Sequence, residues 1–193
     1  TVENIINTKM ELKNCLRDKS NFIDGRSIIK ESILEKNIEI LRQTLRLLSI
    51  EMELDNIYFN PPSGRGSIIK KHAGQIIDQT YNAHPDTVLA TAYEQDANET
   101  ILILGDMAEL GSEEREIHYN LIKKLSKYEI FLTGDIYIGL KDRLANRKVG
   151  FFQNEQDFPN EYLSKQLKAG KKVHFKGSRS SKMERYLKIL LDD

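Results

Sequence analysis

Apolar residues recur every three or four positions near the amino terminus of the chain. Within residues 33–54 they stand at Ile38, Leu41, Leu45, Leu48 and Met52. This spacing is typical of one face of an amphipathic helix, so we expect a helix over Ile33–Leu54. Residues 1–32 match no pattern that we can assign.

A different pattern begins after residues 60–66, where two prolines and two glycines stand close together. Both residue types end helices and favour turns, so this segment is interpreted as a linker. We therefore expect a helical segment over residues 1–60 and a separate domain over residues 61–193.

Short runs rich in β-branched residues alternate with longer helical stretches in the second domain. The runs predict six strands, over residues 68–71, 75–78, 100–104, 129–132, 148–152 and 172–176. The stretches predict helices over residues 85–97, 112–127, 135–144, 156–168 and 180–191. Strands joined through helices of this length form crossover units, which predicts an α/β domain with helices on both faces of a mostly parallel sheet. The tight connection at Ala73-Gly74 is too short for a crossover, so the first two strands should form an antiparallel hairpin at one edge.

Composition narrows the class of protein. Lys and Arg total 29, as do Asp and Glu, so the formal net charge is zero and nothing indicates a nucleic-acid or membrane surface. Apolar runs such as residues 101–104 are far shorter than the roughly 20 residues of a membrane-spanning helix. The single cysteine, Cys15, excludes an internal disulfide, and the four histidines lack the spacing of a metal site. We expect a cytoplasmic protein whose partner is a small molecule or another protein, and we take Thr1 as a cut or processed end.

Polar clusters follow three of the predicted strands, at the edge where an open parallel sheet binds ligands. The first cluster places Asp78 at a strand end, with Asn82 just before a helix start. A strand-end acid in this place can accept hydrogen bonds from ribose hydroxyls. Equally, Asp78 and Asn82 can serve only to shape the turn.

The second cluster leaves its strand through Gly105 and delivers Asp106 and Glu109 to the same edge. Two acids beside an amine-bearing substrate would attract its ammonium group or assist its deprotonation. Spacing alone favours the simpler alternative, an ordinary helix start at Ser112 with acids placed against the helix dipole.

The third cluster ends the last strand and contains Lys176, Ser178, Arg179 and Ser180. Serine hydroxyls directed outward, together with two cations, suit a phosphate or a carboxylate. Ser180 can also be only a helix cap, although a cap needs neither cation.

Taken together and in this order, the clusters resemble the Mur ligases, in the branch that joins UDP-muramoyl-tripeptide to D-Ala-D-Ala. That branch shows Gly-Arg in a linker, then D-x-x-Y-N-A-N-P, then G-D-M-x-E-L-G followed by His, and K-G-S-R-S followed by Met-Glu. The matching residues here are Gly64-Arg65, Asp78–Pro85, Gly105–Gly111 with His118, and Lys176–Ser180 with Met183-Glu184. Four elements in order are far more specific than any one of them.

The resemblance implies a Rossmann-like carboxyl-terminal domain of a ligase of peptidoglycan synthesis, which uses ATP and Mg²⁺ and acts through an acyl phosphate. It implies that Arg65 reaches the ATP phosphates, that Asp78 holds the ribose and that Asn82 lines the same interface. The residues implied to receive the dipeptide are Asp106, Glu109, Lys176, Ser178, Arg179 and Ser180. The full-length protein is expected to be a monomer with further amino-terminal and central domains.

Some positions depart from the family pattern. His84 replaces a usual Asn, Thr87 replaces Ser, and Gln79-Thr80 replaces Asp-Ser. His118 is expected to brace a loop or pack in the core, which spacing favours over acid-base work.

A larger departure is that no G-x-x-x-x-G-K-[ST] pattern occurs in the sequence. The phosphate cradle and the Mg²⁺ ligands are therefore expected in the central domain, so this chain alone should neither hold ATP tightly nor transfer phosphate. Two alternatives stay open. One is a non-catalytic module that binds a nucleotide or dipeptide, and the other is self-association through residues 1–56.

Overall fold

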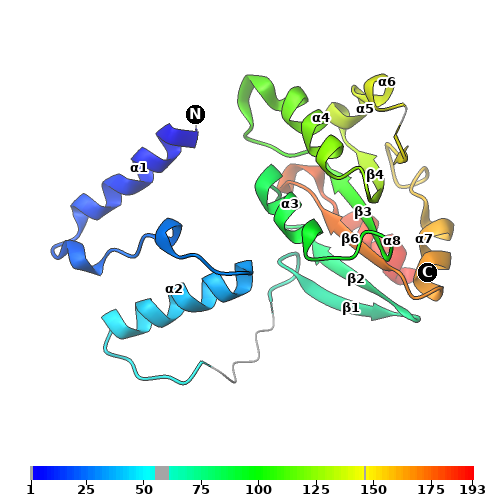
Figure 1. The fold of residues 1–193 in the computed structure, drawn as a ribbon. Coiled ribbons are helices and arrows are strands. Elements are labelled where there is room, and N and C mark those ends of the chain that lie inside the picture. Colours follow the sequence, from blue (N-terminus) through cyan, green and yellow to red (C-terminus); the bar gives the residue numbers. More distant parts are fainter. Residues whose placement is uncertain (1, 55–60, 146) are drawn as a thin grey trace. The chain divides into compact units, whose positions relative to one another are not determined.

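The chain divides into two units, Thr1–Phe59 and Asn60–Asp193, which are described separately (Figure 1). The computed structural model describes residues 2–54, 61–145 and 147–193.

The first unit contains two α-helices joined by an irregular segment. Helix α1 spans Val2–Cys15, two 3₁₀ turns span Lys19–Asn21 and Gly25–Ser27, and α2 spans Ile33–Leu47. Helix α2 begins with a capping box, in which the Ser32 hydroxyl accepts from the Glu35 amide and the Glu35 carboxylate accepts from the Ser32 amide. These reciprocal bonds satisfy two donors that a helix start leaves unpaired.

Helix α2 is shorter than the apolar spacing predicts, because it ends at Leu47 and not at Leu54. Ser49 takes a left-handed conformation, with φ +55°. That turn lets the Ile50 amide donate to the Leu45 carbonyl at 2.9 Å, which closes the helix in the manner of a left-handed cap. Periodicity alone carries no sign of this backbone reversal.

The second unit is built on one six-stranded sheet with the order β1-β2-β6-β3-β4-β5. The first two strands pair antiparallel, and every other neighbouring pair is parallel. The strands are β1 (Ser67–Lys71), β2 (Gly74–Gln79), β3 (Thr100–Gly105), β4 (Glu129–Thr133), β5 (Val149–Phe151) and β6 (Lys172–Lys176). The predicted α/β class, with one antiparallel edge hairpin, is confirmed.

Helices cover both faces of this sheet (Figure 1). One face packs against α3 (Pro85–Tyr93), α4 (Glu114–Lys124), α5 (Asp135–Ile138) and α6 (Lys141–Leu144). The other face packs against α7 (Asn160–Lys168) and α8 (Glu184–Asp192). Strand β3 lies between the two cores and is buried at all of its positions, which explains why its sequence is apolar without alternation.

Several helix boundaries differ from the sequence expectations for local reasons. The helix expected over residues 135–144 is two short helices, and at the break the Gly139 carbonyl accepts from the Arg115 guanidinium at 2.8 Å. The helix expected from residue 180 begins at Glu184, because Arg179–Ser181 form a 3₁₀ turn and Lys182 is left-handed with φ +48°. Helix α7 begins only after Pro159.

The chain leaves β3 and β6, which are neighbours, toward opposite faces of the sheet. Helix α4 follows β3 on one face, and α8 follows β6 on the other. Such a divergence at the carboxyl ends of parallel strands is where open α/β sheets bind ligands. The divergence is closely packed at its base, where buried Met183 contacts Gly105 and Gly177.

We predict that Gly177→Ala destabilises the protein by about 2 kcal/mol, because the added methyl group overpacks the core. A Cβ at Gly177 would lie 2.5 Å from the Met183 Cγ and 3.3 Å from the Gly105 Cα. Urea unfolding would measure the loss. Gly111→Ala is the control, since Gly111 has φ +72° but open space around it, and an equal loss in both variants would contradict the packing argument.

Candidate functional site

A buried carboxylate at the end of β2 holds the linker turn that precedes β1. Asp78 is 2% exposed. One of its oxygens accepts from the Gly64 amide at 2.8 Å, and the other accepts from the Thr80 amide at 3.1 Å and the Thr80 hydroxyl at 2.8 Å. The Ser63 and Ser67 hydroxyls lie 3.4 and 3.5 Å from the oxygen that accepts from Gly64. Asp78 thus fixes the backbone on both sides of Arg65.

Gly64 is required in this turn by geometry. Its φ is +78°, and a Cβ would lie 2.9 Å from the Tyr81 backbone nitrogen. The Tyr81 amide donates to the Gly64 carbonyl at 3.1 Å. The linker therefore runs directly against the first residue after the Asp78 turn, which sets the side chains of Arg65 and Tyr81 side by side.

Two arginines from distant parts of the sequence meet at the Tyr81 ring. The Arg65 guanidinium carbon lies 3.9 Å from the ring centre, and that of Arg179 lies 5.8 Å from it. Tyr81 is 43% exposed. The linker cluster and the last loop cluster therefore lie at the same edge of the sheet, as the strand-end argument expects.

Asp106 faces the protein and not open solvent. Its carboxylate accepts from the Ile136 amide at 2.9 Å and the Tyr137 amide at 3.1 Å, at the start of α5. Burial raises the pKa of this carboxyl, and the two amide hydrogen bonds oppose that rise. A Cβ at Gly134 would collide with the carboxylate, so the close approach depends on glycine.

The loops after β3 and β6 are joined through the Asp106 carbonyl oxygen. It accepts from the Ser178 amide at 3.0 Å and from the Ser178 and Ser181 hydroxyls at 2.6 Å each. Ser178 is 1% exposed, so its hydroxyl points inward, contrary to the expectation that the serines of this loop point outward. Ser180 is exposed, and its hydroxyl lies 2.8 Å from that of Ser178.

Lys176 is a buried cation that shares a neutral acceptor with a histidine. Its ammonium donates to the Gln79 side-chain oxygen at 2.7 Å, and His174 Nε2 lies 3.1 Å from the same oxygen. Burial lowers the pKa of Lys176 to about 8. Burial, and then the charge of Lys176, lowers the pKa of His174 to about 3. Lys176 is thus a cation whose only described partner is an uncharged amide.

The other motif residues have simpler surroundings. The Asn82 side-chain oxygen accepts from the Ala83 amide at 2.9 Å. Glu109 is exposed with φ +63°. His118 is fully buried, and its Nε2 accepts from the Met107 amide at 2.9 Å while Nδ1 donates to the Glu114 carbonyl at 2.7 Å. The predicted loop-bracing role of His118 is confirmed.

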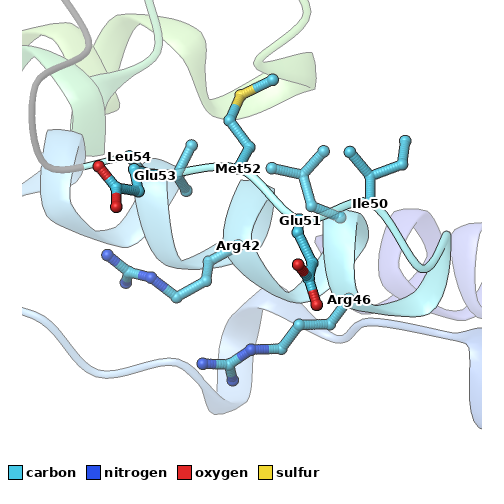
Figure 2. A pocket seen from close by; sticks show the side chains of 8 residues that line it. Arg42, Arg46, Ile50, Glu51, Met52, Glu53 and Leu54 are labelled. Atoms are coloured by element: carbon cyan, nitrogen blue, oxygen red, sulfur yellow. The ribbon is translucent and has the colours of Figure 1, made fainter.

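The first unit contains a hollow of its own. It has a volume of about 460 Å³ and lies between α2 and residues 50–54, which cross over the helix beside Arg42 and Arg46 (Figure 2). No motif residue lines it.

Neither a metal centre nor a membrane span is found in the part of the chain that the structure describes. Within residues 2–54, 61–145 and 147–193, no three His, Cys, Asp or Glu side chains are grouped so that they could hold a metal ion. Among the helices of those ranges, none has the length and apolarity to cross a bilayer.

Comparisons with curated proteins identify relatives of one kind. The chain is 29% identical over 139 residues to the UDP-N-acetylmuramoyl-tripeptide–D-alanyl-D-alanine ligase of Treponema pallidum, a match that covers 67% of this chain and 30% of the relative. It is 31% identical over 134 residues to the enzyme of the same name from Buchnera aphidicola, with 66% and 29% covered. No family model matches the chain.

Solved structures give the same result for the fold. MurF from Acinetobacter baumannii superposes with a TM-score of 0.69 at 22% identity, covering 82% of this chain and 37% of that one. The MurF ligase from Thermotoga maritima, solved in complex with ADP, superposes with a TM-score of 0.68 at 23% identity, covering 81% and 38%. The chain is homologous to the Mur ligases. The resemblance inferred from the sequence motifs is confirmed, and the chain spans about 30% of the length of its curated Mur ligase relatives.

The motif analysis of this Mur ligase relative left some site residues unassigned, namely Tyr81, Gln79 and His174. An exposed aromatic residue three positions after a strand-end acid is a signal for Tyr81. Gln79 and Lys176 lie opposite each other in the β2–β6 register, but strand pairing across nearly one hundred residues cannot be read from either segment alone.

We predict that Asp78→Asn costs about 2 kcal/mol of stability, because an amide cannot accept from the linker and from Thr80 with both of its heavy atoms. Urea unfolding would measure the cost, and amide hydrogen exchange at Gly64 should accelerate. Asp86→Asn is the control, since the Asp86 side chain is 88% exposed. Equal stability of the two variants would refute the bracing role.

A second prediction concerns pH. The pKa of His174 is about 3 in the folded protein against 6.5 for an unperturbed histidine, so the unfolded chain binds the extra proton first. Neutral His174 therefore makes its full contribution to the free energy of unfolding above pH 6.5. Below that pH the free energy of unfolding falls by roughly 1 kcal/mol for each pH unit. His174→Gln should flatten the fall in unfolding free energy between pH 6.5 and 5. Parallel pH profiles of the two proteins would contradict the prediction.

Proposed function

We propose that this chain is the carboxyl-terminal part of an ATP-dependent ligase of peptidoglycan synthesis, which joins UDP-muramoyl-tripeptide to D-Ala-D-Ala. The observation that supports it most strongly is the meeting of Arg65 and Arg179 at Tyr81. Two motifs more than one hundred positions apart thereby present cations at one edge of the sheet. The shared name of the curated relatives supplies the reaction.

The proposed chemistry is acyl transfer through an acyl phosphate. The γ-phosphoryl group of ATP passes to the terminal carboxylate of the tripeptide and ADP leaves. The dipeptide amine then attacks the acyl carbon and loses a proton, and the tetrahedral intermediate expels phosphate to leave the amide. Such a reaction depends on positioning and on stabilising the charge of the phosphoryl group. In this proposal Arg65 supplies that charge, and Arg179 binds the dipeptide carboxylate with the Ser180 hydroxyl beside it.

The contacts divide the remaining motif residues into two groups. Asp78 acts by holding the turn that carries Arg65, and a ribose contact would require it to exchange one of its present hydrogen bonds. Asp106 is occupied in the same way by the α5 amides. Glu109 is exposed, so it is the better placed of the two acids to attract the dipeptide ammonium. Lys176 and Ser178 support the loop from within, and Asn82 lines the nucleotide side.

Magnesium and the ATP phosphates would be held mainly outside this chain. No grouping of acids and histidines suited to a metal ion occurs in its described residues, and the sequence lacks a G-x-x-x-x-G-K-[ST] loop. The residues present therefore do not fit a magnesium site of their own. We propose that a central domain supplies these groups, that the chain alone is inactive and that the intact ligase is a cytoplasmic monomer.

Calorimetry on this chain tests the acceptor site. D-Ala-D-Ala should bind with a millimolar Kd, and Arg179→Ala should weaken that binding by tenfold or more, because it removes a charge-assisted hydrogen bond. Arg143→Ala is the matched control, since Arg143 is an exposed arginine that already pairs with Glu116 at 3.0 Å. Absent binding, or equal binding of L-Ala-L-Ala, would overturn the proposed acceptor site.

A turnover assay separates the ligase from a non-catalytic module. In the intact ligase, Arg65→Ala should lower turnover at least about tenfold while leaving dipeptide binding in place, because the charge it supplies matters most as the phosphoryl group transfers. Phosphate release that depends on both UDP-muramoyl-tripeptide and D-Ala-D-Ala is the assay. A module that only binds ligands would release none.

A further inference from the structure

Tyr81 is placed by a short chain of backbone contacts and not by core packing. The residue is 43% exposed, while its amide donates to the Gly64 carbonyl at 3.1 Å. Gly64 is in turn held by the buried Asp78 carboxylate at 2.8 Å. An exposed aromatic side chain on so firmly held a backbone is suited to orient whatever lies against its face.

What lies against the ring is two positive charges. The distances from the ring centre are 3.9 Å for Arg65 and 5.8 Å for Arg179, so the two guanidinium carbons can be no farther apart than the sum of these distances. The electron-rich face of an aromatic ring attracts a cation within about 6 Å of its centre. Two like charges brought this close on an exposed surface form a favourable place for an anion.

The charges of these arginines are little neutralised by the protein. Arg65 has no carboxylate partner among the residues described by the structure. Arg179 lies 3.6 Å from Glu184, but both side chains are well exposed, at 69% and 46%, and such pairs contribute little.

A second arginine–tyrosine pair in the chain gives an internal comparison. The Arg143 guanidinium also lies 3.9 Å from a ring centre, that of Tyr119. Both of its terminal nitrogens donate to Glu116 at 3.0 Å. The distance to the ring centre is the same, but the charge of Arg143 is already paired with a carboxylate.

We propose that Tyr81 is a positioning residue that orients Arg65 and Arg179 together, so that loss of the ring weakens anion binding at both arginines at once. The proposal rests on the proposed function for the identity of the natural ligands, a phosphate group at Arg65 and a carboxylate at Arg179. It does not rest on it for the placement of the arginines, which can be measured without a ligand.

The ligand-free test is nuclear magnetic resonance of the arginine side-chain Nε–H groups in this chain. Tyr81→Leu removes the ring current and should shift the resonances of both Arg65 and Arg179, while Tyr119→Leu should shift only Arg143. Tyr81→Phe should preserve the positions seen in the wild type. If the Arg179 resonance is unchanged in Tyr81→Leu, the shared orientation is wrong, whatever the activity of the ligase.

The binding test uses inorganic pyrophosphate as the probe for Arg65 and D-Ala-D-Ala as the probe for Arg179. Tyr81→Leu should weaken each by about two- to fivefold, the range expected for an exposed cation–aromatic contact, and Tyr81→Phe should restore both. Tyr119→Leu should change neither. In an Arg65→Ala background, Tyr81→Leu should cause no further loss of pyrophosphate affinity.

The outcomes distinguish this proposal from the proposed function. Equal pyrophosphate affinity in Tyr81→Leu and the wild type would overturn the role of the ring, as would a failure of Tyr81→Phe to restore binding. Absence of saturable pyrophosphate binding by the wild type would also overturn it. A chain that binds pyrophosphate through Tyr81 but ignores D-Ala-D-Ala would support the ring's role at Arg65 and reject the acceptor site.

Discussion

The buried carboxylate of Asp78 is the constraint on which the candidate site depends. It stands at the end of β2, and its described side-chain hydrogen bonds run to the turn before β1, to the first residue of β1 and to the turn after β2. An ionised group at 2% exposure is stable only when its oxygens are satisfied in this way. One of the donors is the Gly64 amide, so the free-energy cost of burying the Asp78 carboxylate is offset only when the linker is ordered. The ordered linker in turn determines where Arg65 lies.

A second junction, between β3 and β6, complements the first. There the acceptor is a backbone carbonyl, that of Asp106, and the donors are the Ser178 amide and two serine hydroxyls. These bonds hold together two loops whose helices depart to opposite faces of the sheet. The side chains that hold these loops, Asp78, Asp106 and Ser178, are thus less exposed than those free to meet a ligand, Arg65, Arg179 and Glu109. Positioning and ligand contact are carried by different residues of the same motifs.

The sequence predicted those features of the fold that depend only on local residue patterns and on the direction of the strands. All six strands, the edge hairpin and the edge of the sheet at which the motifs gather follow from alternating short strands and helices. Helix ends were less accessible, because left-handed residues such as Ser49 and Lys182 are not the glycines that usually signal them. The contacts of Tyr81 with Arg179, and of Gln79 with Lys176, arise because β6 lies beside β2 in the sheet. This strand order is known only from the three-dimensional structure.

The departures from the Mur ligase pattern make physical sense when they are taken in pairs. His84 and Thr87 cap α3 reciprocally, since the His84 amide donates to the Thr87 hydroxyl at 3.2 Å and that hydroxyl donates back to the His84 carbonyl at 2.9 Å. Both bonds use the His84 backbone, so they depend on the hydroxyl at position 87 and not on the side chain at position 84.

Gln79 and Thr80 can be understood in the same way, with different consequences. Thr80 donates to Asp78 at 2.8 Å and so retains the turn. Gln79, in contrast, places a neutral amide where the family pattern has an acid, directly against the Lys176 ammonium at 2.7 Å. An acid there would stabilise the lysine cation, whereas the amide leaves burial to lower the pKa of Lys176 to about 8. The substitution thus preserves the fold of the turn and changes the electrostatics beneath the candidate site.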